Sequence, residues 1–119
     1  KLSSIIANGT KIYVTTNMGY MFYNCKGLVN LDLSWLYTTY NLTTTSMFQG
    51  CSNLQKLDIR NMMINKVKTS MGFTNMFTSV PTTCEIIVMN DACKEWMATN
   101  FASWTNVKTV AEYEAEQGA

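Results

Sequence analysis

Two aspartates occupy the same place in a repeated sequence and could do chemistry together. Asp32 and Asp58 lie one repeat apart, and Lys56 and Arg60 flank the second of them. Two carboxylates about 5 Å apart on neighbouring strands could raise a pKa or hold a cation. Alternatively, each carboxylate accepts hydrogen bonds from nearby backbone N–H groups or pairs with Lys56 and Arg60. We favour this structural interpretation. Acid–base catalysis is expected still less, because no nucleophile and base accompany the pair.

Three aromatic residues, Trp35, Tyr37 and Tyr40, follow Asp32 in a threonine-rich segment. Exposed rings with hydroxyl-rich neighbours often anchor carbohydrate or protein ligands. The same rings could instead wrap the edge of the fold, and both interpretations remain open. If a ligand binds, we expect contact through these rings, with basic side chains as polar neighbours.

The chain has four cysteines and no histidine, which limits its metal and acid–base chemistry. Positions 25, 51, 84 and 93 lack the short paired spacings of a four-cysteine zinc site. Cys25 and Cys51 hold equivalent places, so we expect them to stack as two buried thiols. Free thiols are also favoured over a bridge between Cys84 and Cys93. Since the commonest general base and metal ligand is missing, we expect no enzyme, no cofactor and no metal site.

These residues belong to a 26-residue repeat. Met21-Phe22-Tyr23-Asn24-Cys25 returns as Met47-Phe48-Gln49-Gly50-Cys51, and each copy is followed by the pattern Leu-x-x-Leu-Asp-Leu/Ile. A fixed period in the twenties with this pattern is typical of a leucine-rich repeat solenoid. Because side chains alternate along a strand, one short strand per repeat should turn its apolar residues inward. The expected inward residues are Leu28, Leu31, Leu33, Leu54, Leu57 and Ile59, and the expected outward residues are Asn30, Asp32, Ser34, Lys56, Asp58 and Arg60.

Repeats are expected over residues 1–80 and a C-terminal cap over residues 81–119, because a stack of repeats needs a unit that covers its last core. The second repeat is slightly longer than the first, and we place the extra length in the loop 62–69. The cap should hold a strand at 84–88, a helix at 92–101 that begins at Asn90 or Asp91, an extended piece at 106–110 and a final helix at 111–117.

At the other end of the chain, the first repeat has no recognisable cap. Its apolar interior near Ile5, Ile6 and Ile12 is therefore expected to meet an upstream repeat or a neighbouring subunit. Residues 1–4 hold neither an initiator Met nor a signal peptide, so any targeting segment is expected upstream.

Length and composition exclude several classes of protein. The 119 residues fit about one domain. A net charge of +1 with only 14% charged residues gives no basic stripe, so nucleic acid is not an expected partner. Hydrophobic residues reach 47%, yet no apolar run approaches the roughly 18 residues of a membrane span.

The pattern Met-Phe-x-x-Cys-x-x-Leu-x-x-Leu-Asp-Leu-Ser resembles the BspA-type leucine-rich repeats of bacterial surface proteins. Residues 21–34 and 47–59 carry the motif, and the resemblance covers about residues 10–80. The stretch from Ile86 to Glu112 looks like the closing segment of such proteins, and similar endings occur on phage structural proteins. Asn41, Thr44 and Val80 depart from the repeat pattern.

The fold expected is therefore α/β: a short right-handed leucine-rich repeat solenoid with one short parallel strand per repeat and an α/β C-terminal cap. The resemblance implies an extracellular, non-enzymatic recognition or adhesion module that binds a host or cell-surface protein or glycan. The alternative is a receptor-binding or structural tip of a phage tail protein. The expected binding residues are Trp35, Tyr37, Tyr40, Asp32, Asp58, Lys56 and Arg60.

Overall fold

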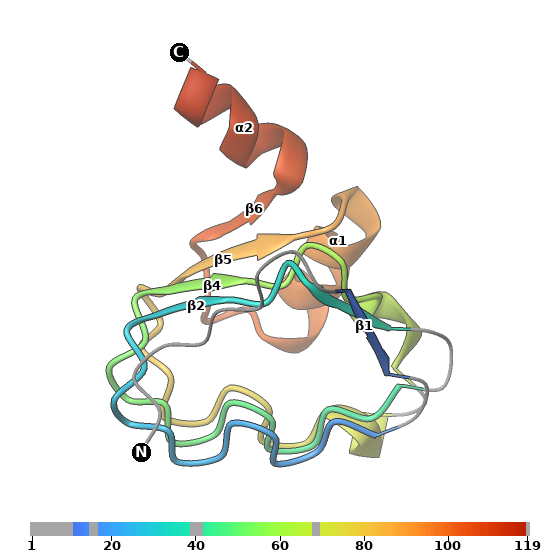
Figure 1. The fold of residues 1–119 in the computed structure, drawn as a ribbon, viewed down its shortest axis with the longest axis vertical. Coiled ribbons are helices and arrows are strands. Elements are labelled where there is room, and N and C mark those ends of the chain that lie inside the picture. The colour runs from blue at the N-terminus through green and yellow to red at the C-terminus, as the bar shows by residue number, and fades with distance from the viewer. Residues whose placement is uncertain (1–10, 15–16, 39–41, 68–69, 119) are drawn as a thin grey trace.

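The computed structural model describes residues 11–14, 17–38, 42–67 and 70–118 of an α/β fold (Figure 1). The strands within these residues are β1 (Ile12–Val14), β2 (Asn30–Asp32), β3 (Leu36–Thr38), β4 (Lys56–Asp58), β5 (Glu85–Val88) and β6 (Val107–Thr109). The helices are α1 (Asp91–Asn100) and α2 (Val110–Gly118), with two short 3-10 helices, η1 (Ile64–Lys66) and η2 (Ser70–Phe73). No helix in the described part is long and apolar enough to cross a membrane.

Four parallel strands in the order β2-β4-β5-β6 make the larger sheet. Leu31 lies opposite Leu57, and Asp32 lies opposite Asp58. The alternation expected from the sequence is confirmed on the inner face, where every predicted inward residue is at most 1% exposed. Burying each such side chain stabilises the fold by about 1.5–3 kcal/mol before entropy is counted. These residues are Leu28, Leu31, Leu33, Leu54, Leu57 and Ile59.

A second, two-stranded sheet pairs β1 with β3 in parallel, so β3 adds a short strand to the one expected in the first full repeat. Ile12 lies opposite Leu36 in this sheet. The N–H of Leu36 donates to the carbonyl of Leu33, so the chain turns directly after β2 and Leu36 re-enters the core at 1% exposure. A strand as short as β3 has too few positions for its alternation to stand out from a loop in the sequence.

Three ladder segments, residues 17–24, 43–50 and 72–79, lie side by side across the body from the larger sheet (Figure 1). Alternate N–H groups of one segment donate to carbonyls of the next, at 2.6–3.0 Å. The backbone repeats its shape as well, because positive φ angles recur at equivalent places. These places are Tyr20, Ser46 and Asn75, and again Asn24, Gly50 and Ser79.

A column of phenylalanine rings fills the interior beside the ladder segments. The ring centroids of Phe22 and Phe48 are 5.8 Å apart, with planes 1° from parallel, and those of Phe48 and Phe77 are 5.7 Å apart at 15°. Phe101 meets the last ring edge-on at 4.9 Å, and Trp104 lies 5.8 Å from it. The column therefore joins all three ladder segments to the C-terminal part of the chain.

The extra length of the second repeat falls near the end of the loop in which it was expected. Leu42 still bridges to Val67, close to the ordinary spacing of the repeat. The N–H of Thr44, in contrast, donates to the carbonyl of Gly72, which lies beyond that spacing. The additional length thus falls between Val67 and Gly72, a stretch that begins within the expected loop 62–69 and leads into η2. Residues 68–69 lie outside the described part of the chain.

Helix α1 begins where the sequence predicts a cap, with Asn90 accepting the N–H of Cys93 at 3.1 Å. Cys93 and Met97 are its buried residues, whereas Ala92, which the apolar spacing places inside, is exposed. Trp96 instead packs against Phe73 of η2, with ring centroids 5.1 Å apart. The helix therefore closes over the end of the ladder through its larger side chains.

All four cysteines are free thiols. Cys51, Cys84 and Cys93 are buried, but Cys25, expected to be buried beside Cys51, is half-buried, because it stands in the outermost of the stacked segments. Burial raises the pKa of Cys51 to about 11 and that of Cys84 to about 12. The two thiols therefore stay protonated at neutral pH.

Substitution of Gly50 tests the ladder geometry. Gly50 has a φ of +83°, and a Cβ there would lie 2.0 Å from the Asn24 Oδ1. We expect Gly50→Ala to lower the free energy of unfolding by at least about 1–2 kcal/mol, the cost of left-handed backbone for a residue with a Cβ. Urea unfolding followed by circular dichroism measures the change. Gly118→Ala, where a Cβ meets nothing within 4 Å, should shift stability by less than about 0.5 kcal/mol, and equal losses would contradict this geometry.

Thiol labelling without denaturant tests the burial of the cysteines. At pH 8 we expect a maleimide to modify Cys25 and to leave Cys51 and Cys84 intact, because only an accessible thiolate reacts. Peptide mass spectrometry identifies the labelled cysteines, and equal labelling of Cys25 and Cys51 would refute this packing.

The raised pKa of Cys51 also affects stability at high pH. In the folded state this pKa rises from 9.0 to about 11, so the unfolded chain releases the proton first and the folded state loses stability between these two pH values.

Candidate functional site

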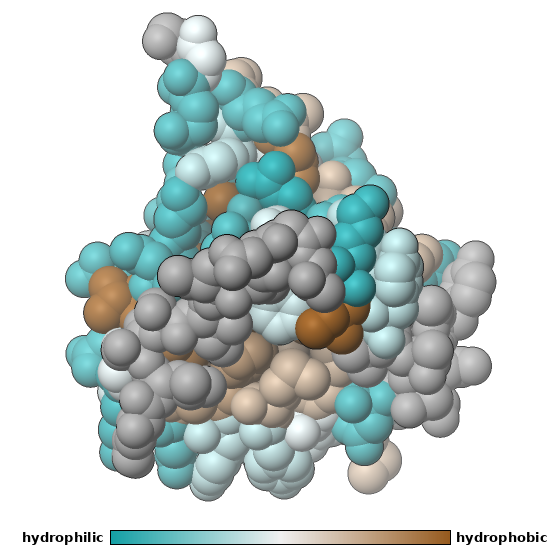
Figure 2. Space-filling view, in the orientation of Figure 1, coloured by the Kyte–Doolittle hydropathy of each residue, from teal (hydrophilic) through white to brown (hydrophobic). Residues whose placement is uncertain are grey.

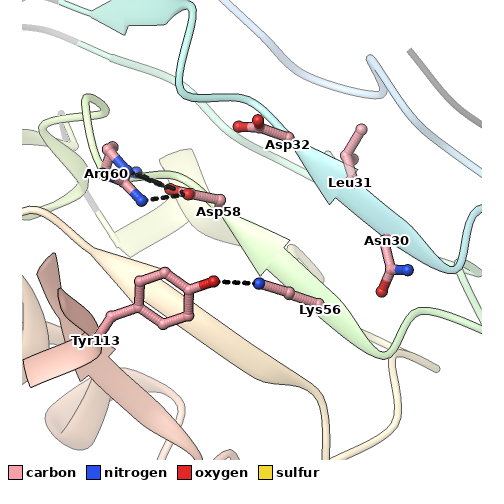
Figure 3. A pocket seen from close by; sticks show the side chains of 7 residues that line it. All are labelled: Asn30, Leu31, Asp32, Lys56, Asp58, Arg60 and Tyr113. Atoms are coloured by element: carbon pink, nitrogen blue, oxygen red, sulfur yellow. Dashed lines mark hydrogen bonds and ion pairs between the residues drawn. The ribbon is translucent and has the colours of Figure 1, made fainter. Parts of the chain in front are cut away.

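A polar cleft of about 380 Å³ lies on the outer face of the larger sheet, bordered by β2, β4 and α2 (Figure 3). Its volume falls within the range of small-molecule sites, about 300–1,000 Å³. The lining residues are Asn30, Leu31, Asp32, Lys56, Asp58, Arg60 and Tyr113. Four binding residues expected from the sequence, Asp32, Lys56, Asp58 and Arg60, thus meet in one place.

Parallel pairing of β2 with β4 sets the polar side chains in two rows. Asn30 lies opposite Lys56, and Asp32 lies opposite Asp58. Since alternate residues of a strand share a face, these side chains point away from the leucines of the core. Arg60 follows shortly after Asp58 and turns back toward it over the same face (Figure 3).

Asp58 departs from the expectation of an exposed position, because it is only 7% exposed. The Arg60 guanidinium covers it, with Nη2 donating to Oδ2 at 2.8 Å and Nε donating to Oδ1 at 3.1 Å. Nη1 of Arg60 also lies 3.9 Å from Glu114 of α2. Hydrogen bonding to Asp58 raises the pKa of Arg60, although burial opposes the rise. A close neighbour in the chain and an overlying helix thus shield a carboxylate that its strand alone leaves open.

Lys56 is held by Tyr113, a residue of α2 that no motif in the sequence indicates. Its ammonium donates to the Tyr113 hydroxyl and lies 4.5 Å from the centroid of the ring. This hydrogen bond raises the pKa of Lys56, while burial works in the opposite direction. The amine at the centre of the cleft therefore stays charged at neutral pH.

Helix α2, which supplies Tyr113, is positioned by polar contacts. Glu112 accepts the N–H of Thr109 at 2.9 Å, and the Thr109 hydroxyl accepts the N–H of Glu112 at 3.1 Å, which is a capping box. Lys108 of β6 pairs with Glu116 and with Glu85, each at 2.8 Å. None of the residues 110–118 is buried, and the helix shows a mostly hydrophilic surface at the top of Figure 2.

Asn30 and Asp32 carry the groups that remain for a ligand. Both side chains are exposed. In the part of the chain that the structure describes, the Asn30 amide has no hydrogen-bond partner and Asp32 forms no ion pair. One carboxylate oxygen of Asp32 accepts the N–H of Ser34 at 2.9 Å, which leaves the other oxygen open. The cleft therefore combines fixed charged groups on β4 with uncommitted polar groups on β2.

Trp35 and Tyr37, two of the aromatic residues expected beside these charges, are not lining residues of the cleft. Trp35 packs against the core, and its Nε1 donates to the carbonyl of Asp32 at 2.9 Å. Tyr37 of β3 packs against Tyr13 in the second sheet, with ring centroids 5.1 Å apart. Tyr40 lies outside the described residues. Of the two interpretations left open by the sequence, the packing of Trp35 supports the structural one.

The carboxylates of Asp32 and Asp58 are engaged in local hydrogen bonds. Among the described residues there is no group of three His, Cys, Asp or Glu side chains that could hold a metal ion. The Arg60 guanidinium already occupies the carboxylate of Asp58. Both aspartates instead make the local hydrogen bonds of the structural interpretation.

Removal of the Arg60 side chain tests the shielded ion pair. Arg60→Ala should lower the free energy of unfolding by about 1–3 kcal/mol, because a largely buried carboxylate loses its hydrogen bonds from the guanidinium and keeps only that from the backbone N–H of residue 60. Lys94→Ala is the matched control, since Lys94 and Glu112 form an ion pair at 2.8 Å that is 41% and 49% exposed. Such an exposed pair contributes about 0–1 kcal/mol. Chemical denaturation compares the two, and a smaller loss for Arg60→Ala would contradict the shielding of Asp58.

Comparisons with protein families, curated proteins and solved structures found no match to this chain. Its function is therefore inferred from its own residues and their geometry.

Proposed function

We propose that this chain is part of a leucine-rich repeat solenoid of the BspA type that serves as a recognition or adhesion module at a bacterial cell surface. Parallel strands whose paired residues lie one repeat apart support this architecture, and so does the ladder of equivalent backbone hydrogen bonds. The polar outer face of the larger sheet is the proposed recognition surface. Stacked repeats commonly bind their ligands over such an extended face.

The main support for the proposal is that one cleft holds two kinds of polar group: some are fixed by hydrogen bonds or ion pairs, and others are free to bind a ligand. Tyr113 holds Lys56, and Arg60 holds Asp58. A site whose groups are ordered before the ligand arrives loses little conformational entropy on binding. Beside these pairs, Asn30 and Asp32 are exposed and able to form new hydrogen bonds.

The lining favours a neutral, hydroxyl-rich ligand. Asp32 and Asp58 contribute two negative charges, and Lys56 and Arg60 contribute two positive ones, so their formal sum is zero. A sugar hydroxyl both donates and accepts hydrogen bonds, which matches an amide and a carboxylate side by side. Among cell-surface ligands we therefore propose a glycan.

Binding is favoured over catalysis by the state of the ionisable groups. The sequence contains no histidine. The amine in the cleft, Lys56, has a raised pKa and is therefore protonated at neutral pH, when it cannot serve as a base or nucleophile.

The proposal is tested by screening the 119-residue chain on an array of neutral glycans and titrating the best of them by calorimetry. Asp32→Ala and Asn30→Ala should each weaken binding by about 1–3 kcal/mol, because each removes a hydrogen-bonding group from the cleft. Glu95→Ala is the control, as Glu95 is an exposed carboxylate of α1 with no ion pair among the described residues. Absence of any bound glycan, or wild-type affinity in both cleft variants, would refute this function for the cleft.

A further inference from the structure

We infer that the free edge of the first ladder segment, residues 17–24, is a docking surface for a further repeat of the same type, stacked in the same parallel direction. This inference rests on the proposed solenoid but not on glycan binding. Three features of the edge carry it: its hydrogen-bonding groups, its exposed apolar side chains and its mismatch with a second copy of itself.

The edge offers hydrogen-bond acceptors without donors. In the second and third ladder segments, carbonyls at alternate positions accept an N–H from the segment before them. The equivalent carbonyls in the first segment belong to Asn17, Gly19, Met21 and Tyr23, and within the described residues no N–H group donates to any of the four. The alternate N–H groups of this segment are already bonded to the second segment. A row of four carbonyls thus faces outward at the spacing that a preceding segment would match.

Apolar side chains are exposed at the same edge. Met21 is 41% exposed, whereas Met47 and Met76, which hold its place in the next two segments, are both fully buried. Ile12 is likewise 44% exposed, while its partner Leu36 is 1% exposed. The repeat buries these positions wherever a neighbouring segment stacks on them. Their exposure here is therefore a property of the edge and not of the position in the repeat.

A second copy brought edge to edge does not supply the missing groups. Two such edges brought together would set carbonyls against carbonyls. At the opposite end, the N–H groups of Asn75, Phe77 and Ser79 have no acceptor among the described residues. There, however, Phe101 and Trp104 pack on Phe77, so a copy stacked head to tail would meet these rings and not the bare end of a repeat. A preceding repeat stacked in parallel would present N–H groups at the positions equivalent to Met18, Tyr20 and Phe22. Its apolar side chains would cover those exposed at this edge. This complementarity selects a further repeat as the occupant.

The test extends the chain by one repeat, a copy of residues 27–52 placed directly before Lys1, which keeps the 26-residue register. Both chains are exposed to hydrogen peroxide, and methionine oxidation is followed by peptide mass spectrometry. In the 119-residue chain Met21 should oxidise much faster than Met47. In the extended chain its rate should fall at least tenfold, toward that of Met47. Met71, which is 79% exposed, is the internal control and should oxidise equally in both.

A second extended chain, with two copies of the repeat, guards against poor folding of a single terminal copy, because its inner copy is stacked on both sides. Persistent oxidation of Met21 in both extended chains would overturn the inference. Sedimentation of the 119-residue chain provides an independent check. It should remain monomeric with Met21 reactive, and a dimer that protects Met21 would assign the edge to a second copy instead. Neither measurement depends on glycan binding, so failure here leaves the proposed recognition surface to its own test.

Discussion

The column of Phe22, Phe48 and Phe77 is the packing on which the rest of the structure depends. Each ring stacks on the next at 5.7–5.8 Å and is at most 3% exposed. The backbone bonds of the ladder segments hold the same repeats in register along one side. Because the repeats are locked at one spacing, the strands on the other side of the core pair in the matching register. The pairing of Asp32 with Asp58 in the cleft is thus a consequence of aromatic packing on the far side of the molecule.

The cleft lies between this sheet and helix α2, and the two walls are held in place in different ways. Helix α2 buries none of the residues 110–118 and reaches the sheet through Tyr113, Glu114 and Glu116. Exposed ion pairs of this kind each contribute little to stability. Beneath the outer face, however, Ile87 lies opposite Asp58 and is fully buried although it is not part of the main core cluster. Helix α2 also contacts β5 and β6, so this packing and several weak polar contacts together position the wall that completes the cleft.

The two ends of the stacked segments contrast in the same way. At the C-terminal end, aromatic side chains meet the last phenylalanine of the column. At the N-terminal end, Met21 and Ile12 are exposed at positions whose equivalents are buried. Cys25, half-buried where Cys51 is buried, follows the same pattern. Equivalent positions of the repeat are thus buried where a neighbouring segment stacks on them and exposed where none does. This is expected of a stacked array, in which each repeat contacts only its neighbours.

Alternation, capping and periodicity are local properties of the chain. They were enough to predict the inward and outward residues of β2 and β4, the alignment of the repeated residues and the start of α1 next to Asn90 or Asp91. Only the tertiary structure decided that β3 pairs with β1, that the extra length follows Val67, and that Asp58 is shielded. It also brought Tyr113 to Lys56 from a distant part of the chain. No local pattern specifies which distant side chains will share a face. Distant side chains meet only when the whole chain packs, and their meeting completes the cleft beside the predicted polar residues of β2 and β4.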